Sequence, residues 1–439
     1  LGDVYKRQAQ RVPIFDAKRK SSIFVKTTDM TPFLKQVADH YMARGGISGT
    51  CFIFPNRRSQ VFFTKYLGEA VKEVGTPIVA PKMLTINDFF FRISGDKPAD
   101  RVNLLLDLYE CYKDLNPKHE TLDEFIFWGD VILGDYDDVD KYLVDPVRLF
   151  ANVSEFKEIQ DSYSYLTENQ RKAIESFISH FRSEGRLTVD LNSDNPNVKE
   201  RFLQIWNILL PLYNNFRGRL SGKGLAYEGM VYRGLAARLD TESAVDVMGA
   251  AFEGVEEYVF VGLNALNECE KKVMRRMRDA GLAEFCWDYS GAMVKNPLNK
   301  SSFFMSRNVK DFPQAFELDP DGLKTPEIEV ISVPSSVGQA KLIPSVVKDE
   351  RCAVVLPDET LLIPVLNSIP EDIRDINVTM GYPMKSSAFF DFMTLVSAMQ
   401  MHLRQKDGKW YYYHSQVWSL FSSGIFRKVT FGDKAVRDR

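Results

Sequence analysis

Residues 50–62 read T-C-F-I-F-P-N-R-R-S-Q-V-F, and this stretch decides the fold. Its first five letters form a short continuous apolar run rich in β-forming residues, which is typical of a buried strand. The letters P-N-R-R at 55–58 break that strand, and a helix begins at Ser59. A buried strand that leads directly into a helix is the first repeat of an α/β fold.

The following segment repeats this order. We predict a second strand at 78–80, ended by Pro81, and then a helix that Thr85 caps and that ends at Gly95. Strand, helix, strand and helix in this order predict a parallel α/β sheet.

The rest of the chain alternates between helical and α/β patterns. Residues 101–240 show long helical periods and few strand signals, which indicates a helical insertion. The α/β pattern returns after it, and a third α/β segment begins at 327, beyond a looser polar stretch at 291–326. From 386 the pattern is helical again. The elements expected here are helices at 101–112, 121–133, 166–181, 198–216, 267–278 and 336–349, and strands at 258–261, 284–287, 329–333, 352–356 and 376–379.

The two ends of the sequence differ from what lies between them. The first eight residues fit no pattern that follows, and residues 9–29 are basic and aperiodic, without the apolar core of a signal peptide. We therefore expect residues 1–29 to be a non-native or disordered head, with a credible start at Met30. We also expect the chain to be the amino-terminal part of a longer protein.

Bulk composition excludes several classes of protein. Hydrophobic residues make up 45% of the chain and its formal net charge is −3, so it is neither disordered nor a basic nucleic-acid module. It has no run of roughly 18 apolar residues, so we expect no membrane contact. The five cysteines are odd in number and never spaced C-x-x-C, which predicts reduced thiols in a cytoplasmic protein and no zinc ribbon.

The motifs of nucleotide and metal chemistry are incomplete. The nearest match to a phosphate loop, at 218–224, is one residue short, has glycine in place of the hydroxyl residue, and lies among helices. The acidic run at 135–140 has Asp140 where a calcium loop needs glycine, so we expect a solvated helix–loop junction there. Pro357-Asp358-Glu359 is followed by no E-x-K, so the sequence shows no nuclease site. We predict no catalytic and no metal-binding residue in this chain.

One polar cluster has a better position. Asn56, Arg57, Arg58 and Ser59 follow the first strand at the start of a helix, where guanidinium and backbone N–H groups can hold phosphate. Ligands of open α/β sheets bind outside the carboxyl ends of the strands. The alternative is a helix cap with two solvated arginines.

A second pair of candidate residues, Thr85 and Asn87, occupies the same place after the next predicted strand. Together the six side chains form our candidate nucleic-acid site.

Several motifs resemble a known family. F-I-F-P-N-R-R resembles the single-strand-contacting motif of UvrD-like superfamily 1 helicases, and M-L-T-I-N-D-F-F-F-R-I resembles their next motif. Further stretches make the chain similar to bacterial AddB-like proteins, which carry a PD-(D/E)XK nuclease domain at their carboxyl end. These stretches are 122–145, 224–233, 259–271 and 376–383.

The resemblance implies an architecture of helicase-like (RecA-like) parallel-sheet lobes with large helical insertions. Residues 30–100 and 241–326 would form the first lobe, 101–240 the helical insertion, 327–400 the start of a second lobe, and 401–439 the start of a second insertion. It also implies the nuclease-bearing subunit of an AddAB-type helicase–nuclease, which processes double-strand DNA ends for recombination. Its partners would be single-stranded DNA and an AddA-like helicase subunit. Mg²⁺ and an iron–sulfur cluster would belong to the later nuclease domain, with no cofactor in this chain.

Two functions stay open. One is a scaffold without ATPase activity that guides a DNA strand and docks a motor subunit; the other is a protein–protein interaction module with no DNA contact. The net charge of −3 favours the second, and the positioned pair Arg57 and Arg58 favours the first. A small-molecule enzyme would need a convergent polar pocket, which the sequence does not indicate.

Overall fold

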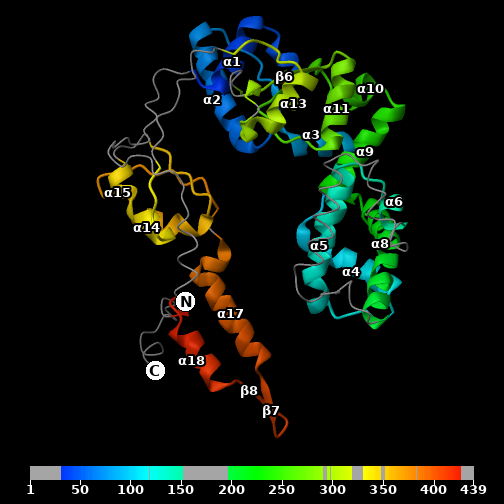
Figure 1. Ribbon diagram of the computed structural model, residues 1–439, viewed down its shortest axis with the longest axis vertical. Helices are drawn as coiled ribbons and strands as arrows, with labels where there is room; N and C mark the ends of the chain where they lie inside the picture. Colours follow the sequence, from blue (N-terminus) through cyan, green and yellow to red (C-terminus); the bar gives the residue numbers. More distant parts are fainter. Residues whose placement is uncertain are drawn as a thin grey trace. The chain divides into compact units, whose positions relative to one another are not determined.

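The computed structural model describes residues 31–117, 119–151, 196–289, 294–296, 298–318, 330–347, 352–381 and 383–426, and of 151 and 196–207 only the backbone. The chain divides into two compact units (Figure 1). The larger unit is Thr27–Lys324, and the smaller unit joins Leu1–Lys26 to Thr325–Arg439.

The larger unit contains a four-stranded sheet in the order β2-β1-β5-β6, and every neighbouring pair is parallel. The central strand β1 buries all five of its residues. The prediction of an α/β fold with a parallel sheet is confirmed. The strands are β1 (Thr50–Phe54), β2 (Lys82–Thr85), β5 (Glu257–Val261) and β6 (Ala283–Cys286).

The second predicted strand was misplaced. Residues 78–80 precede the strand, and β2 begins only after Pro81, at Lys82. Proline has no N–H for a ladder hydrogen bond, so here it marks the entry to the strand and not its end. The register pairs Cys51 with Lys82 and Phe54 with Thr85.

Helices cover both faces of the sheet because the side chains of each strand alternate between the faces. On one face, α1 (Phe33–Arg44) and α2 (Arg57–Val74) pack on Phe52, Phe54, Val259 and Val261. The opposite face presents Cys51, Ile53, Tyr258 and Phe260. It is covered by α3 (Ile86–Ser94), α9 (Glu228–Thr241), α10 (Ala244–Ala251), α11 (Glu268–Asp279) and α13 (Phe303–Asp311).

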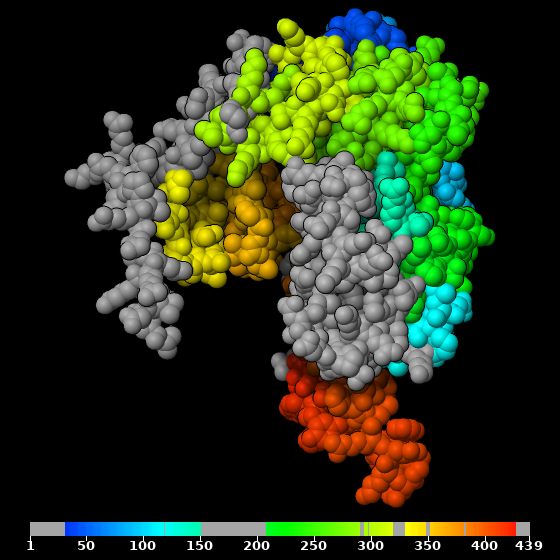
Figure 2. Space-filling view, turned by 45° about the vertical axis from the view of Figure 1, so that its right-hand side comes forward, coloured from blue at the N-terminus to red at the C-terminus, as the bar shows by residue number. Residues whose placement is uncertain are grey.

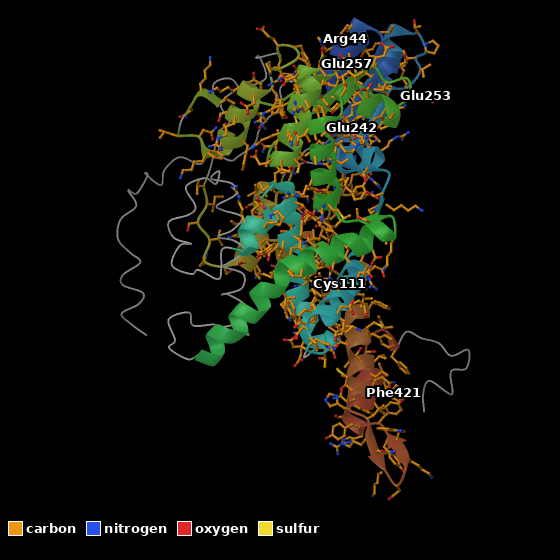
Figure 3. All side chains as sticks on the ribbon, turned by 90° about the vertical axis from the view of Figure 1, so that its right-hand side faces the viewer. Arg44, Cys111, Glu242, Glu253, Glu257 and Phe421 are labelled. Atoms are coloured by element: carbon orange, nitrogen blue, oxygen red, sulfur yellow. The ribbon has the colours of Figure 1, made fainter. Side chains whose placement is uncertain are left out.

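An ionic clamp joins α1 to the amino-terminal ends of the strands. Arg44, in the last turn of α1, lies beside Glu257 at the start of β5 (Figure 3), and its Nη1 is 3.0 Å from Glu284 Oε2 on β6. Thr50 Oγ1 donates to Glu257 Oε2 at 3.3 Å. These polar contacts fix α1 at one edge of the sheet and leave the carboxyl-terminal edge to other groups.

The short strands β3 (Lys97–Pro98) and β4 (Leu225–Ala226) pair in parallel. The segment that they enclose is mainly helical where the structure describes it, and it has a hydrophobic core separate from the clusters on the sheet. The helix expected at 166–181 lies outside the described residues. The helices of this part are α4 (Arg101–Leu115), α5 (Leu122–Lys141), α6 (Pro146–Ala151) and α8 (Pro196–Gly222).

The helical part meets the sheet part where α5 packs on α9, and a glycine allows the close approach. A Cβ added to Gly229 would lie 2.5 Å from the backbone oxygen of Asp137 and 2.9 Å from Asp140 Cβ. We expect Gly229→Ala to lower the free energy of unfolding by about 1–3 kcal/mol, because the two helices must separate. Urea unfolding followed by circular dichroism measures this loss.

Gly234 on the same helix provides the matched control for this prediction. An added Cβ there meets nothing within 4 Å, so Gly234→Ala should raise stability by up to about 1 kcal/mol through helix propensity. Equal urea midpoints for the two variants would contradict the close-packing argument.

The smaller unit is helical with one β-hairpin, in the part that the structure describes. The strands expected at 352–356 and 376–379, and the described part of 329–333, are not formed there, because no neighbouring strand hydrogen-bonds to them. Within the described part of 336–349, two short helices take the place of the single helix expected there. The assignment of 327–400 to a second helicase-like lobe stays a prediction. The elements are α14 (Ser336–Lys341), α15 (Ile343–Val346), α16 (Leu362–Leu366), α17 (Ala388–Met401), β7 (Arg404–Lys406), β8 (Lys409–Tyr411) and α18 (His414–Ser422).

Candidate nucleic-acid interface

The carboxyl ends of the four strands lie along one edge of the sheet. The register places Phe54 beside Thr85 and Val261 beside Cys286. The helices that follow β1 and β5 leave toward opposite faces, since α2 packs on one face and α11 on the other. Ligands of open α/β sheets bind at such a divergence. The six predicted residues lie at this edge or directly beyond it, after β1 and at the end of β2.

Asn56 and Ser59 build the first turn of α2. Asn56 is the N-cap residue, and its Oδ1 accepts from the backbone N–H of Ser59 at 3.0 Å and from the Ser59 hydroxyl at 3.2 Å. An N-cap of this kind satisfies one of the free N–H groups of the first turn. The local role of these two side chains is thus structural. The capped turn that they form holds the backbone of Arg57 and Arg58, which lie between them.

Arg57 and Arg58 are the first two residues of α2, and both are exposed. The first turn of α2 contains no acidic residue, and among the described residues neither arginine forms an ion pair. Positive side chains at the positive end of a helix dipole repel it by several tenths of a kcal/mol. A bound anion would reverse this repulsion, so this turn has the electrostatics of a phosphate contact.

Thr85 and Asn87 are at the same edge but are engaged within the protein. Thr85 caps α3: its Oγ1 accepts from the backbone N–H of Asp88 at 3.2 Å and donates to the Asp88 carboxylate at 2.7 Å. Asn87 Nδ2 donates to Glu228 Oε1 at 2.8 Å, and Asn87 Oδ1 accepts from the Tyr232 hydroxyl. Both polar atoms of Asn87 therefore connect α3 to α9.

The loop that follows β5 carries no side chain suited to bind phosphate. The sequence there is Gly262-Leu263-Asn264, and Gly262 adopts a left-handed φ of 68°. The Asn264 carbonyl accepts from Asn308 Nδ2 at 2.6 Å, which holds this loop against α13. An added Cβ on Gly262 would approach Phe33 of α1 at 3.5 Å, so the loop lies against the start of α1.

The near match to a phosphate loop at 218–224 is the end of a helix. It completes α8, and Lys223 Nζ donates to both carboxylate oxygens of Asp107, at 2.5 and 2.8 Å. Arg219 Nε also donates to Asp107, at 2.8 Å. These two cations lower the pKa of Asp107 despite its burial. Lys223 thus joins α8 to α4, away from the strand ends.

Sequence reasoning missed Asp140, a buried residue with several polar partners among the described residues of the larger unit. The expectation of a solvated helix–loop junction at 135–140 is wrong, because the run belongs to the carboxyl-terminal turns of α5 and Asp140 is fully buried. Its carboxylate accepts from the hydroxyls of Tyr213 and Tyr227 and pairs with Arg217 and Arg233. The helical period contained the signal, since Asp140 lies one turn after the buried Tyr136.

The buried thiols show no sign of catalytic activation. Cys51, Cys111, Cys269 and Cys286 are buried and unpaired, and burial raises the pKa of Cys51 and of Cys269 to about 12. Reactive thiols have lowered pKa values, so these two groups behave as core side chains.

Comparison with models of protein families and with curated proteins gives no match. Within the described residues, no group of three or more His, Cys, Asp or Glu side chains is arranged to hold a metal ion. No helix in the described ranges is long and apolar enough to cross a lipid bilayer.

Proposed function

We propose that this chain is the helicase-like part, without ATPase activity, of an AddB-like helicase–exonuclease subunit in double-strand break repair and recombination. In this role it guides single-stranded DNA and docks an AddA-like motor subunit. One observation carries the proposal: Arg57 and Arg58, which form no ion pair with any residue that the structure describes, lie at the carboxyl edge of a parallel sheet, on the turn that Asn56 caps.

The form of the larger unit supports a RecA-like lobe. Its sheet is parallel, helices cover both faces, and the connections diverge between β1 and β5. A working nucleotide site at this point needs a phosphate-binding loop and a carboxylate for Mg²⁺. The loop after β5, Gly262-Leu263-Asn264, contains no carboxylate for Mg²⁺. Lys223, the lysine of the near match to a phosphate loop, forms an ion pair with Asp107. We infer a lobe that keeps the motor's sheet and binds no nucleotide.

The two arginines are expected to contact DNA phosphates, so their removal should weaken binding. We expect the double variant Arg57→Ala, Arg58→Ala of the whole chain to bind a labelled oligothymidylate roughly tenfold more weakly at low salt, which equals about 1.4 kcal/mol. The slope of log K against log salt should fall by about 1.4, because two phosphate contacts are lost. Fluorescence anisotropy at several salt concentrations measures both quantities.

Lys65 and Lys72 provide a control with the same change of charge on the same helix. Both are exposed and lie further along α2, so Lys65→Ala, Lys72→Ala should leave affinity and salt slope near those of the parent. If the arginine variant and the lysine variant bind alike, the site assignment is wrong. If the parent does not bind DNA but binds a motor subunit, the chain is a protein–protein module.

A further inference from the structure

In the smaller unit, a β-hairpin formed by β7 and β8 connects α17 to α18 and protrudes from these two helices (Figure 2). Its two-residue turn is Asp407-Gly408, and both residues have positive φ, 53° and 73°. This is the geometry of a type I′ turn, which matches the twist of the two strands it connects. The register is therefore fixed, with Arg404 opposite Tyr411 and Lys406 opposite Lys409.

The register gathers three cations on one face of the hairpin. Residues that pair across strands share a face, and successive pairs lie on opposite faces. The first and third pairs, Arg404 with Tyr411 and Lys406 with Lys409, therefore lie on the same face. Gln405 and Trp410 lie on the other face. All residues of β7 and β8 are exposed.

The cationic face is not neutralised within the described part of the chain, where none of its three cations forms an ion pair. Lys406 and Lys409 are directly opposite each other, and like charges in that position destabilise a hairpin. A two-stranded hairpin is only marginally stable by itself. A bound polyanion would relieve the repulsion and stabilise the hairpin at the same time.

Exposed aromatic rings accompany these charges. Tyr411 and Tyr412 are 50% and 51% exposed, and the Arg404 guanidinium lies over the Tyr413 ring, 4.8 Å from its centroid. Single-stranded nucleic acids are bound by this combination, in which cations contact phosphates and aromatic rings stack on bases. An acidic protein segment would match the charges but would leave the rings without planar partners.

We propose that the β7–β8 hairpin is a second binding surface for single-stranded nucleic acid, with Lys406 and Lys409 on phosphates and Tyr411 stacked on a base. The choice of a nucleic acid as the polyanion rests on the proposed function. The surface itself rests on its own residues, which lie in a different unit from Arg57 and Arg58.

The test uses the whole chain and a labelled oligothymidylate. Lys406→Gln, Lys409→Gln should weaken binding roughly tenfold at low salt and lower the salt slope by about 1.4. The same variant removes the like-charge pair, so the hairpin itself should not be destabilised. Lys341→Gln, Lys385→Gln changes two exposed lysines of the same unit and should bind like the parent. Unchanged binding by the hairpin variant, or an equal loss in the control, overturns the proposal.

Tyr411 gives a second readout that charge alone would not move. Tyr411→Ala should weaken binding roughly tenfold, and Tyr411→Phe should restore it, because phenylalanine keeps the stacking surface. Displacement of the oligonucleotide by polyglutamate as efficiently as by unlabelled oligonucleotide would assign the surface to an acidic protein chain. Loss of binding in the hairpin variant with none in the Arg57, Arg58 variant would retain the hairpin and remove the site on α2.

Discussion

Replacement of Asp140 by Ala is expected to lower the free energy of unfolding of the larger unit by about 3–5 kcal/mol. Asp140 is fully buried, and its carboxylate is the common partner of Arg217 and Arg233. Removing it leaves two guanidinium groups largely buried without their counter-ion, a cost that exceeds the value of the intact pair. Thermal unfolding should show a midpoint lowered by roughly 10 °C.

The effect should be large because the Asp140 carboxylate joins three helices. Asp140 belongs to α5, Arg217 to α8 and Arg233 to α9. The Tyr227 hydroxyl, at the start of α9, also donates to the carboxylate. The carboxylate of Asp140 therefore connects the helical part to α9, which packs on the sheet.

Asp130 on the same helix supplies the control for Asp140. It pairs with Arg101 at the surface, so Asp130→Ala should cost less than about 1 kcal/mol. Adding Arg217→Met to Asp140→Ala should cost less than Arg217→Met alone, because the arginine no longer has a counter-ion to lose. Similar melting points for the Asp140 and Asp130 variants would show that the buried network carries no special stability.

The fold was predictable where strands are buried on both faces. The apolar runs at 50–54, 258–261 and 284–287 correspond to β1, β5 and β6. Strands of a parallel sheet that is covered on both faces bury side chains on both sides, so their sequences are continuously apolar. The strand β2 has the sequence K-M-L-T, which is less apolar than residues 78–80, so a prediction from local hydrophobicity placed the strand at 78–80. The position of an edge strand depends on its pairing with β1, and a short window of sequence does not contain that information.

The sequence predicted where the candidate site lies in the fold, but only some of the roles of its side chains. A strand that leads into a capped helix placed Asn56 and Arg57 at the carboxyl edge of the sheet. Asn87 was predicted with the same logic, but Glu228 and Tyr232 of α9 take both its polar atoms, and these residues lie more than 100 positions away. Asp140 was missed because its acidic neighbours read as a solvated run, whereas the helical period assigns it to the buried side.

Replacement of Glu270 by Gln is expected to stabilise the protein at pH 8 and to have little effect at pH 5. Glu270 is 8% exposed, and its Oε2 accepts from the Asn267 backbone N–H at 2.9 Å in a capping box at the start of α11. Burial raises the pKa of Glu270 from its ordinary 4.5 to about 7, although Lys141 and Lys271 act in the opposite direction. Glutamine retains the acceptor for the capping hydrogen bond and carries no charge.

The folded protein therefore holds a proton on Glu270 more tightly than the unfolded chain does. Stability from this group is present below pH 4.5 and is lost as the pH rises toward 7, by about 3 kcal/mol in all. Urea unfolding of the parent and the variant at several pH values should show a difference that grows through this window and then levels. Glu268→Gln, in the same turn, loses an ion pair of 3.0 Å with Lys271 and a charge favourable to the helix dipole, so it should destabilise by less than about 1 kcal/mol. A Glu270 variant that follows the Glu268 variant in sign would mean that the buried carboxylate is stabilised by Lys141 and Lys271 more than burial opposes it.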